Sequence, residues 1–128
     1  MRSAADPAVI RWTGTVPTSD LAITVVTEAE LRFGLARLPA GRRRDSLAGA
    51  IEQMLQGLLG GRILAFDRDA TGYYGAFMAA RVGRGMKTGV ADAMIAAIAR
   101  ARDASLIATR DVSHFQGCGV RLIDPWTA

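Results

Sequence analysis

The sequence is poor in cysteine and histidine, and it lacks long apolar runs. Its 128 residues include one cysteine, Cys118, and one histidine, His114. A lone cysteine has no disulfide partner within the chain, and it favours a reducing, cytoplasmic compartment. No apolar run approaches the length of a membrane span, and the residues after Met1 do not resemble a signal peptide. We therefore expect a cytoplasmic protein with no membrane segment.

Arginine and apolar residues are abundant. Half of the residues are hydrophobic, and 128 residues fit a single domain with a sizeable core. Sixteen basic against twelve acidic residues give a net charge of +4 and an isoelectric point near 10.2. This charge suits a polyanionic partner, and arginine is the side chain best shaped for phosphate oxygens. The same richness in arginine and alanine is also what a coding bias would produce.

Predicted strands and helices alternate along the chain. Short β-branched or apolar runs predict strands, and apolar residues at helical spacing predict helices. Strands and helices in alternation indicate an α/β fold with a mainly parallel sheet covered on both faces. The expected strands are 21–26, 62–66, 105–109 and 119–123; the expected helices are 8–12 (opened by Asp6-Pro7), one opening at 27–30, one between 41 and 60, one from Asp67 or Asp69 to about Arg81, and 90–99.

The stretch 90–99 predicts a buried helix that is apolar almost all round. Its alanines let neighbouring elements approach closely, and Thr88 is a candidate N-cap. Asp92 is the exception, because an ionised carboxylate is costly to bury without a cation, a donor or water beside it. A first-turn aspartate stabilised by the helix dipole is the simpler interpretation.

Two further acids favour a functional interpretation. Glu30 and Asp111 follow the ends of the strands predicted at 21–26 and 105–109. Ligand sites of open α/β sheets gather at the carboxyl ends of strands, so both should face one crevice, which Asp92 can join. Three acids in one cleft repel each other unless a cation separates them. Oxygen ligands without a Cys/His set select Mg²⁺ or Mn²⁺, and such an ion in an arginine-rich cleft suits phosphodiester hydrolysis.

Each candidate also has a purely structural interpretation. Thr27 and Glu30 match a capping box, and aspartates in turns, such as Asp111, usually bond their own backbone. Asp67 is interpreted as a helix cap. His114 has no second ligand of its type, so we expect no metal role for it. Cys118 has no activating neighbour, and we expect it to be inert.

Three motifs resemble those of PIN-domain proteins, and more closely of VapC-type toxins and their FitB-like relatives. They are 26–35, 91–97 and 108–115. The resemblance implies a three-layer PIN-like fold and an Mg²⁺-dependent endoribonuclease, held inactive by an antitoxin protein and usually a homodimer. It implies that Glu30, Asp92 and Asp111 are the catalytic and metal-binding acids.

One family feature has no counterpart in this sequence. Family members begin with a central strand ending in Leu-Asp-Thr-Asn-Val, whose Asp is a principal metal ligand. We therefore expect a single PIN-like domain over 1–128 without that first strand, with four parallel strands at most and impaired metal binding. The alternative function is a non-catalytic remnant that binds an antitoxin or RNA. An unrelated acidic-site hydrolase, such as a small phosphatase, is a distant third.

Leucines also recur on the two helices predicted between residues 27 and 60. We expect them to form a helical hairpin used for self-association or antitoxin docking, and core packing explains them equally well. The residues of this leucine stripe are Leu31, Leu35, Leu47, Ile51, Leu55 and Leu58.

Overall fold

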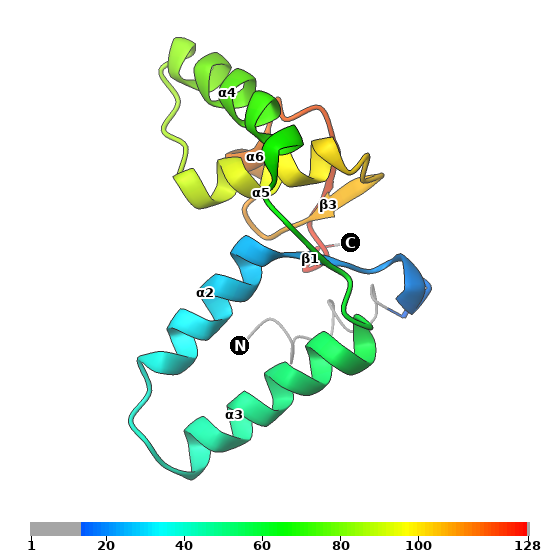
Figure 1. Ribbon diagram of the computed structural model, residues 1–128. Coiled ribbons are helices and arrows are strands. Elements are labelled where there is room, and N and C mark those ends of the chain that lie inside the picture. The colour runs from blue at the N-terminus through cyan, green and yellow to red at the C-terminus, as the bar shows by residue number, and fades with distance from the viewer. Residues whose placement is uncertain (1–13, 128) are drawn as a thin grey trace.

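The computed structural model describes residues 14–127, which form a mixed α/β fold (Figure 1). The helix predicted at 8–12 lies outside the described residues. Over the described range, no helix has both the length and the apolar character needed to span a bilayer. The elements are a 3-10 turn at Thr18–Asp20, β1 (Ile23–Thr24), α2 (Val25–Ala36), α3 (Arg42–Gln53), a π-helical continuation at Met54–Leu58, β2 (Ile63–Leu64), α4 (Arg68–Gly83), α5 (Val90–Ala101), β3 (Leu106–Ala108), α6 (Val112–Phe115) and β4 (Arg121–Ile123).

The four strands found between residues 14 and 127 form two separate parallel pairs. β1 pairs with β2, with Ile23 opposite Ile63, and β3 pairs with β4, with Ile107 opposite Leu122. The predicted α/β class with parallel strands is confirmed. β1 and β3 are not hydrogen-bonded to each other. Each pair therefore keeps two outer edges, one on each strand, that no described strand covers.

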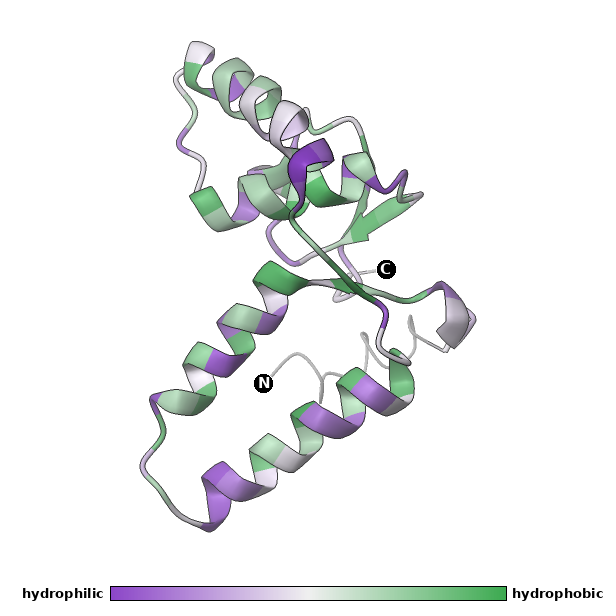
Figure 2. Cartoon of the chain, in the orientation of Figure 1, coloured by the Kyte–Doolittle hydropathy of each residue, from purple (hydrophilic) through white to green (hydrophobic). Residues whose placement is uncertain are grey.

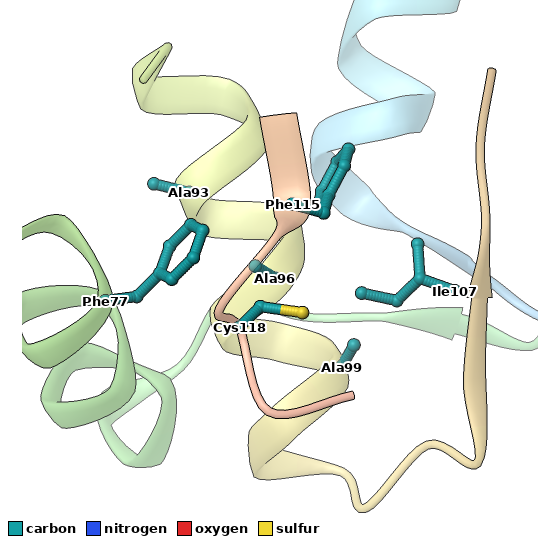
Figure 3. Packing of buried hydrophobic residues seen from close by; sticks show 7 residues of the cluster. All are labelled: Phe77, Ala93, Ala96, Ala99, Ile107, Phe115 and Cys118. Atoms are coloured by element: carbon teal, nitrogen blue, oxygen red, sulfur yellow. The ribbon is translucent and has the colours of Figure 1, made fainter. Parts of the chain in front are cut away.

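Helix α5 is the centre of the core, as its sequence predicts. One side of the helix packs against Phe77 of α4, Ile107 of β3 and Phe115 of α6, as Figure 3 shows. Another side contributes to a second cluster with Ala70 of α4. The buried residues of α5 are Ala93, Ala96, Ala97, Ile98 and Ala99. Because these side chains are mostly alanines, α4 and α6 can approach the helix closely.

The boundary between β1 and α2 lies earlier than the sequence suggested. The β-branched run ending at Val26 predicted a longer strand, but the helix begins at Val25. Thr24 is buried, with 7% of its surface exposed, and its hydroxyl accepts a hydrogen bond from the Thr27 amide at 3.1 Å. This cap fixes the helix start. The alternative interpretation of Thr27 and Glu30 as a capping box is therefore wrong, because the Thr27 amide already donates to Thr24.

Helices α2 and α3 form a hairpin that extends away from α4, α5 and α6 (Figure 1). Ile51, Leu55 and Leu59 are buried at its base and in contact with partly buried leucines of both helices. Leu58 is 46% exposed and Phe33 is 65% exposed. Hydrophobic positions recur along both helices in Figure 2. The predicted helical hairpin is present, and its leucine stripe is only partly used for packing within the chain.

Candidate functional site

Asp92 lies in the first turn of α5 and pairs with the sole histidine. Its Oδ2 is 3.0 Å from Nδ1 of His114, which lies on α6. The side chains are 30% and 51% exposed, so both remain accessible to solvent. The hydrogen bond, together with the positive end of the α5 dipole, stabilises a carboxylate here. Asp92 is thus both a first-turn acid and a partner of a polar side chain on another element.

The Asp92–His114 pair opens onto a depression of about 780 Å³. Its wall is apolar on the α4 side and at Met86 of the loop that leads into α5, and polar at Lys87, at Thr88 and at the pair itself. Such a mixture can hold a flat organic group against the apolar wall while polar atoms fix its orientation. The lining residues are Met78, Val82, Met86, Lys87, Thr88, Gly89, Asp92 and His114.

Asp111 directly precedes α6, the short helix that carries His114. Its carboxylate is exposed and does not cap the helix, and its carbonyl accepts the His114 amide at 2.9 Å. Its own amide donates to the Thr109 hydroxyl at 3.0 Å. The Asp111 carboxylate therefore does not hydrogen-bond the neighbouring backbone, as an aspartate in a turn usually does. Because α6 packs on α5, the segments carrying Asp111 and Asp92 lie together.

Glu30 lies in the second turn of α2, and its side chain is exposed. The nearby acid Glu28 is occupied, because Arg32 bonds it at 2.7 Å and also reaches Glu52 at 3.1 Å. The hydrogen bonds to Glu28 and then to Glu52 raise the pKa of the Arg32 guanidinium above its ordinary value. Glu28 is thus tied into a surface network, while no ion pair with Glu30 forms within residues 14–127.

Asp67 is excluded as a site acid by its contacts. It caps α4 by accepting from the Ala70 amide at 3.3 Å, which confirms the sequence prediction. Its other oxygen pairs with Arg102 at 2.6 Å. Cys118 is buried, with 8% of its surface exposed, and is a free thiol packed in the α5 cluster.

Comparison with known proteins identifies the fold that carries these residues. A family model described as PIN domain matches residues 2–116. The chain belongs to the PIN-domain family. VapC ribonuclease Y4jK of Sinorhizobium fredii is 40% identical over 125 residues, which cover 98% of this chain and 89% of the relative. Toxin FitB of Neisseria gonorrhoeae is 31% identical over 126 residues, which cover 98% and 90%.

A solved structure supports the same placement. FitAB bound to an IR36 DNA fragment superimposes with a TM-score of 0.86 at 30% sequence identity, covering 94% of this chain and 84% of that one. This PIN domain is therefore of the VapC- and FitB-like toxin kind, as the three sequence motifs indicated.

The acids of this PIN domain do not form a ready metal site within the described residues. Between residues 14 and 127, no three His, Cys, Asp or Glu side chains lie close enough together to hold one ion. Asp92 is hydrogen-bonded to His114, while Glu30 and Asp111 are exposed. A hard divalent cation needs several oxygen ligands at short distance, so the described arrangement does not fit one.

Sequence reasoning missed the role of His114 in this PIN domain. Its position three residues after Asp111 was the available signal, because a short helix there brings both residues to the same turn. The contact with Asp92 joins residues 22 positions apart and depends on how α6 packs on α5. Local spacing does not encode that packing.

Proposed function

We propose that this protein is a metal-dependent endoribonuclease and the toxin of a toxin–antitoxin pair, and that weak metal binding slows its cleavage of RNA. The observation that carries the proposal is the 40% identity with VapC ribonuclease Y4jK across 98% of the chain. The match to the PIN domain model covers all three candidate acids.

The proposed site consists of Glu30, Asp92 and Asp111, with Mg²⁺ or Mn²⁺ as the metal. Asp92 and Asp111 are supported by the packing of α6 on α5, and Glu30 by the contact between α2 and α5. Because the described side chains do not assemble around one ion, we expect weak metal binding and slow cleavage. No chemical step is assigned to the metal.

The proposed partners are RNA, an antitoxin protein and a second copy of the chain, with the cytoplasm as the compartment. The net charge of +4 favours binding to a polyanion such as RNA. The antitoxin is proposed because a similar solved structure is of FitAB, an assembly that binds DNA, and because Toxin FitB is a relative. The exposed Leu58 and Phe33 of the α2–α3 hairpin are available to a protein partner.

The second candidate function is a non-catalytic protein that binds an antitoxin or RNA. The absence of an assembled three-acid cluster between residues 14 and 127 favours it. Binding does not need the acids, whereas cleavage does. The two candidates therefore predict different results for RNA cleavage: a nuclease stops cleaving when the metal is chelated, whereas a binding protein does not cleave at all.

The test is an RNA cleavage assay on the purified full chain, with Mg²⁺ added stepwise and then removed with a chelator. RNA binding is measured in parallel by fluorescence anisotropy. Slow cleavage that rises with Mg²⁺ and stops with chelator supports the nuclease. Binding without cleavage at any Mg²⁺ concentration supports the non-catalytic alternative. Cleavage that the chelator leaves unchanged contradicts both.

A further inference from the structure

Arg81, in the last turn of α4, is a buried charge with no carboxylate partner among residues 14–127. It is 3% exposed, and none of the ion pairs formed by residues 14–127 includes it. A buried guanidinium is costly unless polar groups replace the water it loses. An unpaired buried cation therefore needs a structural or functional reason.

Neutral oxygens and one aromatic ring surround the guanidinium. Its Nη1 donates to the carbonyls of Gln116 at 3.0 Å and Ser113 at 3.3 Å, and its Nη2 donates to the carbonyl of Lys87 at 3.4 Å. Its Nε donates to the Thr88 hydroxyl. The ring of Phe77 lies 5.4 Å from the guanidinium carbon, close enough for a cation–π contact.

These oxygens belong to the two segments that carry the Asp92–His114 pair. Lys87 and Thr88 end the loop that leads into α5, four or five residues before Asp92. Ser113 and Gln116 flank His114 on and just after α6. Thr88 was predicted to cap α5, but Gly89 occupies the N-cap position and the Thr88 hydroxyl accepts from Arg81 instead.

We infer that Arg81 is a positioning residue of the candidate site. Its hydrogen bonds connect the start of α5 and the α6 turn to α4, and so they keep Asp92 and His114 within hydrogen-bonding distance of each other. The geometric part of this inference is independent of the proposed function, and only its effect on cleavage rests on it. A guanidinium suits this task because its planar fork can donate to acceptors in several directions at once. The ammonium of lysine is a single point and cannot reach all four oxygens.

The first experiment compares Arg81→Lys with wild type. His114 is the only histidine, so its ring signals in a ¹H–¹³C NMR spectrum at one fixed pH report its contact with Asp92 directly. We expect these signals to shift toward their positions in Asp92→Asn. RNA cleavage should fall by about ten- to a hundredfold, which is the usual effect of substituting a residue that orients the side chains of a site.

Two controls separate positioning from general stability. Arg84→Lys makes the same chemical change at an exposed residue one turn further along, and it should leave the His114 signals unchanged. Ile51→Ala lowers stability from the hairpin core, away from the site. If Ile51→Ala moves the His114 signals as much as Arg81→Lys does, or if neither variant moves them, the inference is wrong.

Chemical rescue provides a second, independent test. In Arg81→Ala, millimolar guanidinium ion should return the His114 signals toward wild type, and ammonium ion at the same concentration should not. If the alanine variant does not fold, the lysine variant alone decides the question. If wild type does not cleave RNA while Arg81→Lys still displaces the His114 signals, the proposed function fails and the positioning role stands.

Discussion

At the residue scale, Asp92 is the side chain on which the candidate site depends. Within residues 14–127, it is the one acid of the three whose carboxylate hydrogen-bonds a side chain of another element, since its Oδ2 lies 3.0 Å from His114 Nδ1. Its position in the first turn of α5 would stabilise a carboxylate whether or not the protein is a nuclease. Substitution therefore has to separate a catalytic role from a helix-stabilising one.

Asp92→Asn should abolish metal-dependent RNA cleavage and leave the fold intact. The change removes a charge at nearly constant shape, and weakening a contact between two partly exposed side chains costs less than about 1 kcal/mol of stability. Cleavage and thermal unfolding of the same preparation provide the measurement. Asp69→Asn is the matched control, because Asp69 is also a first-turn acid, on α4, and it should cleave as wild type does. Full activity in Asp92→Asn would show that the carboxylate is only structural.

The sequence identified the candidate acids but not the residues that arrange them. Asp67 was correctly predicted as a cap, because a cap is a local feature of a few consecutive residues. His114 and Arg81 were not recognised, because their partners lie on other elements: Asp92 is 22 positions from His114, and Gln116 is 35 positions from Arg81. Such contacts depend on the packing of α4, α5 and α6.

At the element scale, the sequence predicted each strand within residues 14–127 at the right place and too long. β1 covers Ile23–Thr24, whereas the apolar run predicted 21–26, because the Thr24 hydroxyl caps α2 and the helix begins at the next residue. β2, β3 and β4 are also shorter than their apolar runs. For β1, the β-branched run showed where the strand lies, but the capped first turn of α2 determines where it ends.

The hairpin core provides a stability prediction. Ile51 is 1% exposed in the cluster that joins α2, α3 and β2. Ile51→Ala should lower the free energy of unfolding by about 2–5 kcal/mol, because a buried aliphatic side chain is replaced by a cavity. Urea unfolding followed by circular dichroism measures the loss. A change well below 1 kcal/mol would mean that the hairpin is not packed as described.

Leu58 tests whether the same hairpin also serves self-association. It is 46% exposed, so Leu58→Glu should change stability by no more than about 0.5 kcal/mol. If the proposed homodimer uses the leucine stripe, a charge there should weaken it. Sedimentation equilibrium of both proteins over a range of concentrations gives the answer. A wild type that stays monomeric, or a variant that dimerises equally well, would leave core packing as the stripe's role.

At the scale of the whole molecule, the two strand pairs set the expectation for stability. β1 and β3 each present an edge to which no strand from residues 14–127 is bonded, and unpaired backbone groups cost on the order of 1 kcal/mol each when buried. We expect the isolated chain to melt below the range of about 45–65 °C that is typical of mesophilic domains, or to aggregate. Scanning calorimetry is the measurement. A cooperative transition of a soluble monomer within that range would contradict the expectation.

The central proposal is that this PIN domain is a metal-dependent nuclease whose candidate acids bind the metal only weakly, through Asp92. Mn²⁺ binding, followed by electron paramagnetic resonance in the absence of RNA, tests it directly. Affinity falls with the number of charged ligands, so we predict one site with a dissociation constant on the order of 1 mM or weaker, lost in Asp92→Asn and kept in Asp69→Asn. Micromolar binding in wild type, or binding that Asp92→Asn leaves unchanged, would contradict the account.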